Sequence, residues 1–294
     1  GTNWTGTLIG GATLSGGQVV LDGSSGYVQL PAGLVSNMDN LTLETWVTFI
    51  GNPINTWAPV FAFGDTDTNS DANSGLGENY VVFQPHTAAP ACQQAFGQGL
   101  PGSGAETDAV GANPLDGLTN VHIVAVYNAD AGTFVYYTNG VLAASANILN
   151  TLTSPSSFAG PCGGHTALAY TLGADPFNFL GHSLYAADPY LNASYDEFRV
   201  YDAALQPSQI MADYLIGPSQ VIGSNTNITL TATVSAGNLT ITWPTTAASV
   251  ALVSSPVLGA GAAWTPVVGT LTIVGGNYQE TVTATGTSQF FKLE

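Results

Sequence analysis

Short runs of β-branched and aromatic residues recur along this chain, and each run is bounded by Gly, Asn, Asp or Pro. Clear examples are LTLETWV at 41–47, VHIVAVY at 121–127 and TFVYY at 133–137. Runs of this length and composition are typical of β-strands, and Asn139-Gly140 suits the tight turn of a hairpin. The alternation around Glu44 predicts a strand with one buried face. The sequence therefore predicts an almost entirely β protein.

The composition changes after residue 217. Segment 206–215 predicts a short helix, and beyond it the chain becomes rich in Thr, Val and Ala. The charge changes at the same place, because 17 of the 19 acidic residues lie before it and two lie after it. We therefore predict two domains in this 294-residue chain, residues 1–217 and residues 218–294, the second being a small β-sandwich.

The chain has only two basic residues, Arg199 and Lys292, and its formal net charge is −17. Two cations cannot form the basic patch that nucleic acids or anionic membranes require, so both are excluded as direct partners. No apolar run reaches the roughly 18 residues of a membrane helix, so direct membrane insertion is not expected. The first residue is Gly rather than Met, as in a processed protein. We therefore expect a secreted protein, extracellular or at the cell surface.

Two cysteines and five glycosylation motifs bear on the same compartment. Cys92 and Cys162 both lie in segments rich in Gly, Pro and Ala. In an oxidising compartment they predict one disulfide, the alternative being two unpaired thiols. The motif Asn-X-Ser/Thr marks candidate glycosylation sites, although in a chain rich in Asn and Thr several arise by chance. These candidates are Asn3, Asn40, Asn192, Asn227 and Asn238.

Several ordered segments of the first domain match one family. They are LDGSSGYVQLP at 21–31, LTLETWV at 41–47, HIVAVY at 122–127, YYTNG at 136–140, LGHS at 180–183 and SYDEFRVY at 194–201. In this order they resemble the laminin-G-like, concanavalin A-like jelly roll of bacterial secreted and surface proteins. The C-terminal part, with ITWP at 241–244 and WTPV at 264–267, resembles a fibronectin type III module. The resemblance implies an all-β chain: a concanavalin A-like jelly-roll sandwich followed by a small immunoglobulin- or fibronectin-III-like β-sandwich.

Two groups of acidic residues are candidate calcium ligands. Oxygen-bearing side chains at every second residue of one loop suit a hard divalent cation such as Ca²⁺, the alternative being a solvated polar loop. That loop supplies Asp65, Asp67, Asn69 and Asp71. The resemblance also implies a structural calcium at the rim of the jelly roll, and Asp22 and Asp196 lie in its signature strands. For Asp196 the alternatives are pairing with Arg199 or capping a turn.

The sequence offers little that points to catalysis. Glycosidases on such folds need paired carboxylates, often as E-x-D-x-x-E on one strand, and this pattern is absent. Asp196 and Glu197 are adjacent, so in a regular strand they point to opposite faces. The motif G-x-S-x-G is also absent, and His122 lies in a strand pattern that favours packing. We therefore predict that the protein is not an enzyme.

Aromatic side chains suggest carbohydrate as a ligand. Jelly rolls of the resembled type frequently act as lectins, and exposed aromatic rings stack on sugars beside Asn and Asp. The candidates are Trp57, Tyr80, Tyr185 and Tyr190, for which packing in the core or pinning of loops is the alternative.

The scarcity of charge, 7% of residues, favours a surface that contacts other molecules. The favoured role is a non-catalytic structural or adhesive subunit of an extracellular fibre, sheath or matrix, which associates with copies of itself through uncharged faces or strand edges. The second reading is a calcium-dependent carbohydrate-binding module that recognises extracellular polysaccharide. A polysaccharide lyase or glycoside hydrolase is the third.

Overall fold

The computed structural model describes residues 4–35, 38, 40–67, 75–88, 93–97, 106–128, 131–147, 176–218, 228–235, 237–245, 250–259, 262–283 and 288–293. The chain divides into two compact units, residues 1–138 with 142–204 and residues 139–141 with 205–294. The helix that precedes the predicted boundary therefore groups with the second unit. In the described part, no helix has the length and apolar character needed to cross a membrane.

Within the described residues, the first unit forms two antiparallel sheets of seven strands each. Sheet A has the order β1 (Thr7–Ile9), β4 (Tyr27–Leu30), β13 (Phe177–Leu180), β6 (Phe61–Thr66), β7 (Gly77–Gln84), β8 (Gln93–Gly97), β9 (Thr107–Val110). Sheet B has the order β12 (Val141–Asn147), β11 (Thr133–Thr138), β10 (Val121–Asn128), β5 (Leu41–Phe49), β14 (Asn192–Tyr201), β3 (Gln18–Asp22), β2 (Thr13–Ser15).

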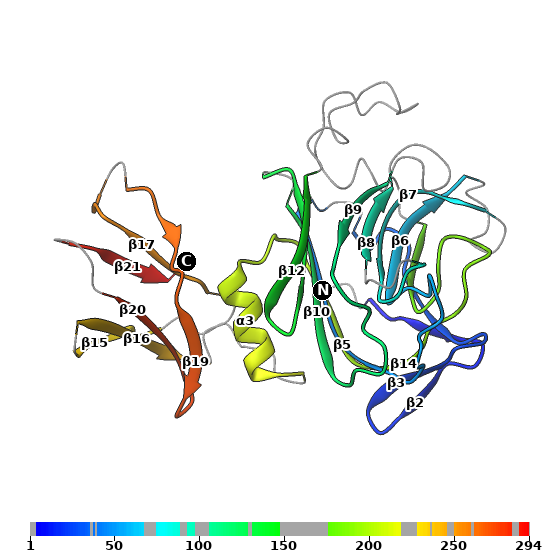
Figure 1. Cartoon of the computed structure of the whole chain (residues 1–294), viewed down its shortest axis with the longest axis horizontal. Helices are drawn as coiled ribbons and strands as arrows, with labels where there is room; N and C mark the ends of the chain where they lie inside the picture. Colours follow the sequence, from blue (N-terminus) through cyan, green and yellow to red (C-terminus); the bar gives the residue numbers. More distant parts are fainter. Residues whose placement is uncertain are drawn as a thin grey trace. The chain divides into compact units, whose positions relative to one another are not determined.

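The core of this unit lies between the two sheets. Alternate residues of the central strands point inward, such as Leu43 and Val47 of β5, Phe61 of β6, Phe83 of β7 and Tyr136 of β11. Each large apolar side chain removed from water in this way contributes about 1.5–3 kcal/mol. Figure 1 shows strands β6 to β9 in one layer and β5, β10 and β14 in the other. The predicted all-β sandwich is confirmed.

Strand β5 differs from its prediction because both of its faces are buried. Its inward face carries Leu43 and Val47, as the alternation indicates. On the opposite face, Thr42, Glu44 and Trp46 are also at most 1% exposed. A carboxylate in such a position must be compensated by charge and hydrogen bonds. The alternation therefore gave the correct faces but not the burial of the outer one.

The partners of Glu44 come from β10 and β14. One carboxylate oxygen lies 2.8 Å from Nε2 of His122. The other accepts a hydrogen bond of 2.6 Å from the hydroxyl of Tyr201 and one of 3.2 Å from Nη1 of Arg199. Arg199 also donates to Glu197, at 2.9 Å. His122 is thus packed in a strand, as predicted, and Arg199 is held on the outer face of sheet B.

The second unit also has two sheets. Sheet C has the order β15 (Thr231–Ser235), β16 (Asn238–Pro244), β20 (Asn277–Thr283), β19 (Thr270–Val274). Sheet D has the order β18 (Thr265–Pro266), β17 (Leu252–Ser255), β21 (Phe290–Leu293). The predicted helix is α3 (Pro207–Ile216), and its first turn is closed by a capping box between Gln206 and Gln209.

The core of the second unit is small and contains polar groups. Trp243 and Tyr278 pack 5.6 Å apart between Ile241, Leu252 and Leu271. Glu280 is in the same interior and is 2% exposed. The two-sheet arrangement agrees with a β-sandwich, while the resemblance to fibronectin type III stays a prediction.

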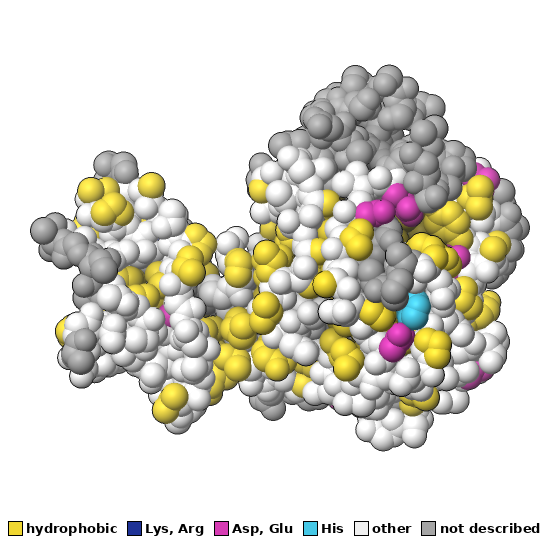
Figure 2. Space-filling model, viewed as in Figure 1, with side chains coloured by type: hydrophobic (Ala, Val, Ile, Leu, Met, Phe, Trp, Pro, Cys, Tyr) yellow, Lys and Arg dark blue, Asp and Glu magenta, His cyan; other side chains and the backbone are white. Residues whose placement is uncertain are grey.

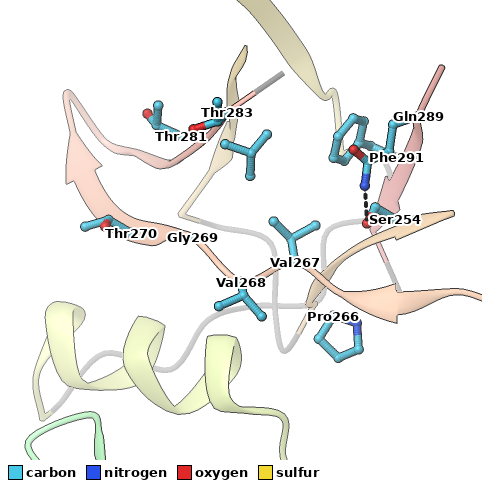
Figure 3. Close-up of a pocket in the computed structure, with 11 residues that line it drawn as sticks. Ser254, Pro266, Val267, Val268, Gly269, Thr270, Thr281, Thr283, Gln289 and Phe291 are labelled. Atoms are coloured by element: carbon cyan, nitrogen blue, oxygen red, sulfur yellow. Dashed lines mark hydrogen bonds between the residues drawn. The ribbon is translucent and has the colours of Figure 1, made fainter. Parts of the chain in front are cut away.

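A groove of about 610 Å³ opens in this unit, with side chains of both sheets along it. Figure 3 shows Thr281 and Thr283 on one side and Ser254 and Phe291 on the other. Nε2 of Gln289 donates to Oγ of Ser254 at 3.0 Å across one end of the lining. The described residues along it include no titratable side chain.

Candidate functional site

A second apolar cluster covers the outer face of sheet A, away from the core. Its buried members are Ala62, Tyr80, Val82, Phe179 and Leu184, with Tyr27, Phe177 and Tyr185 packed against them. The segment after β13 folds over this face and is tied to it by backbone hydrogen bonds. The N–H of Gly181 donates to Val60, and the N–H of Ala186 donates to Gly75, each at 3.1 Å. This outer face, with the covering segment 181–190, is the candidate site.

Two tyrosines predicted to bind glycans meet in the candidate site. The hydroxyls of Tyr80 and Tyr185 are 2.6 Å apart, and their rings pack edge to face. Tyr80 also donates to the carboxylate of Glu106. Gly77 makes room for the pair, since a Cβ there would lie 2.8 Å from the Tyr80 ring and 2.9 Å from the Tyr185 ring. The pair therefore fixes the position of Tyr185.

The prediction that Tyr80 stacks on a sugar is wrong. Its side chain is 1% exposed because the apolar cluster and Tyr185 cover it. Burial, together with the charge of Glu106, raises the pKa of its hydroxyl, so Tyr80 is a neutral donor. Tyr185 is half-buried and leaves part of its ring accessible. Of the two, only Tyr185 can offer a ring to a ligand.

Three acidic residues surround this tyrosine pair. Burial raises the pKa of Glu106, the hydrogen bond from Tyr80 opposes this, and the charges of Asp108 and Asp188 raise it further. Burial also raises the pKa of Asp188 to about 6, although Ser183 donates to its carboxylate at 2.7 Å. The same Ser183 hydroxyl accepts from the N–H of Tyr185 at 3.1 Å. Ser183 therefore joins the carboxylate of Asp188 to the backbone of Tyr185.

The sequence reasoning did not select Glu106, Asp108 or Asp188. Isolated carboxylates carry no motif, and the first two are far from residues 185–188 in the chain. The segment Tyr185-Ala-Ala-Asp188-Pro-Tyr190 does contain a signal, because two aromatic residues flank a carboxylate within one short loop.

The other two predicted aromatic residues lie beside separate groups. Tyr190 stacks on His182 with ring centroids 4.8 Å apart and lies 6.0 Å from Tyr27. Trp57 is half-buried, and its carbonyl accepts from Nε2 of Gln84 on β7 at 3.4 Å. Thus the structure brings Tyr80 and Tyr185 together and leaves Tyr190 and Trp57 in other contacts.

The calcium prediction for residues 65–71 is only partly within the described residues. Asp65 is 8% exposed and accepts hydrogen bonds from the backbone and side chain of Asn79, at 2.7–3.2 Å. Asp67 accepts from the N–H of Leu76 at 2.9 Å. Asn69 and Asp71 lie outside the described residues. Both described carboxylates therefore accept hydrogen bonds within the β6–β7 hairpin. The calcium site stays a prediction.

The other two predicted calcium ligands have protein partners. Asp22 accepts from the backbone N–H groups of Ser24, Ser25 and Gly26 at 2.7–2.9 Å. These bonds, that from Ser25 first, lower its pKa to about 2. Asp196 accepts from Nε2 of Gln18 at 3.2 Å. Within the described ranges no group of three His, Cys, Asp or Glu residues is placed to hold a metal.

The strand containing Asp196 is irregular at that residue. The register of β14 on β5 shifts between Tyr195 and Glu197, which marks a β-bulge. Glu197 and Arg199 both follow the bulge and point to the outer face of sheet B, where they pair. The simple alternation assumed for Asp196 and Glu197 therefore does not hold through this strand.

The remaining predicted sites are only partly visible. Cys92, Cys162, Asn3 and Asn227 lie outside the described residues. Among the other glycosylation candidates, Asn238 is exposed, whereas Asn40 and Asn192 are half-buried. Glycosylation and the disulfide both stay predictions.

Comparison with protein families identifies the first unit. A laminin-G family, described as the concanavalin A-like lectin/glucanases superfamily, matches residues 22–211. The chain belongs to this superfamily. The match runs from the end of β3 into α3 and confirms the predicted resemblance. A comparison with curated proteins gave no match.

Solved structures similar to this superfamily member are distant in sequence. Domain 4 of the Geobacillus stearothermophilus GH43 arabinanase AbnA, in complex with arabinotriose, is 22% identical, with 70% of this chain and 86% of that domain covered and a TM-score of 0.48. The Ruminococcus gnavus IT-sialidase CBM40 bound to α2,3-sialyllactose is 11% identical, with 63% of this chain and 95% of that chain covered and a TM-score of 0.44. The K499G mutant of the NanB sialidase from Streptococcus pneumoniae is 14% identical, with 78% of this chain and 33% of that chain covered and a TM-score of 0.46.

Proposed function

We propose that the first unit binds carbohydrate on the outer face of sheet A, around Tyr185. The observation that carries this proposal is a half-buried tyrosine ring beside the carboxylates of Glu106 and Asp188, on a sandwich of the lectin/glucanase superfamily. The apolar face of a sugar packs on an aromatic ring. Sugar hydroxyls donate to carboxylate oxygens, and an ionised carboxylate acts only as an acceptor.

The site is held in place before any ligand arrives. Tyr80 fixes the hydroxyl of Tyr185, Ser183 fixes its backbone, and the segment that carries both is bonded to Gly75. Preorganisation of this kind reduces the entropy lost on binding. It supports recognition by a rigid face rather than by a loop that must first fold.

We further propose that the protein binds its ligand without cleaving it and acts outside the cell. A lyase could use His122 and Arg199, but both are held in the Glu44 network on the other sheet, where His122 is buried and Arg199 is 13% exposed. Glycoside hydrolysis is the alternative, favoured by the raised pKa of both Glu106 and Asp188. Formation of new reducing ends from a bound oligosaccharide would support this alternative.

Truncation of Tyr185 tests the proposed site. In titration calorimetry with oligosaccharides, we expect Tyr185→Ala to weaken binding at least ~tenfold, because the stacking ring is lost. Tyr214→Ala, on α3 of the second unit and 37% exposed, is the matched control and should bind as the unaltered chain does. Equal affinity of the two variants would place the ligand elsewhere.

Self-association is a second candidate function, favoured by β15. Every residue of this edge strand is exposed, and Val234 is 73% exposed although its neighbour across the ladder, Leu239, packs in the core. From Leu205 on, the chain carries three acids and Lys292, against sixteen acids and Arg199 before it. Copies therefore repel each other least through the second unit.

A charge on β15 tests this association. If copies pair through this strand, Val234→Lys should raise the dimer dissociation constant about tenfold or more in sedimentation equilibrium, because a lysine would enter an apolar contact. Val274→Lys, at another exposed valine of sheet C, is the control and should associate as before. A chain that stays monomeric at all concentrations would refute self-association.

A further inference from the structure

We infer that the candidate site takes neutral saccharides and rejects anionic ones such as uronates and sialates. This inference rests on the proposed carbohydrate site and adds the chemical class of its ligand. An anionic sugar is bound tightly when a cation, most often Arg, pairs with its carboxylate. The chain has only two Lys and Arg residues, so the position of each decides whether such a pair can form.

Arg199 is the basic residue of the first unit, and it faces away from the candidate site. It follows the bulge of β14 on the outer face of sheet B, whereas the candidate site is on the outer face of sheet A. Its guanidinium donates to Glu44 and Glu197 and lies 4.6 Å from the ring centroid of Trp46. Its hydrogen bonds to both carboxylates would have to break before it could bind a ligand.

The other cationic groups that the structure describes are also engaged. Lys292 belongs to the second unit, where its ammonium lies 4.7 Å over the ring of Trp264. Nδ1 of His86 lies 2.9 Å from the carboxylate of Asp116. His182 is 3% exposed and packs between the rings of Tyr27 and Tyr190.

The charges that do face the site are negative. Burial is the largest cause of the raised pKa of Tyr185, and the negative charges of Glu106, Asp188 and Asp108 raise it further. All three carboxylates are therefore close enough to interact with its hydroxyl. Figure 2 shows acidic side chains gathered beside hydrophobic ones on the face in view, and none of the coloured side chains there is Lys or Arg. A carboxylate on the ligand would be repelled, while hydroxyl groups would find acceptors.

A pair of ligands that differ only in charge tests this inference. Trigalacturonic acid and its methyl ester have the same sugar rings, but only the acid is anionic. At pH 7.5 and low ionic strength, titration of the full chain should show at least ~tenfold weaker binding of the acid, and added salt should reduce the difference. Lactose and sialyllactose form a second, less closely matched pair, because the anionic member also carries one additional sugar residue.

One variant locates the repulsion. Asp108→Asn removes an exposed carboxylate next to Glu106 and should narrow the difference between acid and ester. Asp202→Asn removes the same charge from an exposed residue after β14 and should leave the difference unchanged. Equal or tighter binding of the acid would overturn the inference and leave the carbohydrate site standing. Binding of neither ligand pair nor any other neutral oligosaccharide would overturn both.

Discussion

Arg199→Leu should lower the free energy of unfolding of the first unit by about 3–5 kcal/mol, the usual cost of leaving a buried charge without its partner. Glu44 is 0% exposed, and Arg199 and, if protonated, His122 are the cations that face its carboxylate. Burial alone would lower the pKa of Arg199, but its hydrogen bond to Glu197 and the charge of Glu44 raise it. The loss is measured by urea unfolding followed by tryptophan fluorescence.

The double variant Glu44→Gln, Arg199→Leu separates the contribution of the ion pair from the cost of leaving one buried charge unpaired. Because neither charge then remains, it should lose less stability than Arg199→Leu alone. Lys292→Leu is the control, since it removes the other basic residue, whose cation–π contact is worth about 0.5–1 kcal/mol. If the free energy of unfolding of the Arg199→Leu chain lies within about 1 kcal/mol of the original value, Glu44 is solvated and the account of a buried ion pair is wrong.

The second unit should lose stability as the pH rises from about 4.5 to about 7. Burial raises the pKa of Glu280 from its ordinary 4.5 to about 7, with the N–H of Gly269 opposing the shift. The folded unit therefore holds a proton that the unfolded chain has already released, and stability falls with pH across this window. The expected decrease is about 2–3 kcal/mol.

Glu280→Gln should abolish this decrease and make the unit more stable than the original at pH 8. The amide keeps the size of the side chain and its acceptor for Gly269, but it carries no charge. Asp108→Asn, at an exposed carboxylate, is the control and should leave the second transition unchanged. Differential scanning calorimetry between pH 4.5 and 8 measures both variants, and a pH-independent second transition in the original chain would contradict the assignment.

The fold could be predicted because its signals are local and ordered. The strand runs, the Asn139-Gly140 turn and the helix near Pro207 are each set by a few adjacent residues. The order of the strand segments along the chain then indicates the laminin-G family. The burial of Glu44 could not be predicted, because its partner Arg199 is 155 residues away and faces it only through the β14–β5 register.

The candidate site was predicted in part. Tyr80 and Tyr185 are both predicted from the sequence, but nothing in the residues around them distinguishes the buried ring from the accessible one. That difference depends on the 2.6 Å contact between hydroxyls 105 residues apart and on the apolar cluster over sheet A. Glu106 and Asp188 were missed for the same reason, since only the folded chain brings them to Tyr185.

Hydrogen exchange with and without a neutral oligosaccharide tests the central claim most directly. If the sugar binds around Tyr185, the amides of segment 181–190 and of β7 should exchange more slowly in its presence. Those of β10 and β14, on the opposite sheet, should exchange at their original rates. Protection confined to sheet B or to the second unit, or no protection by any neutral sugar, would contradict the assignment of a carbohydrate site to sheet A.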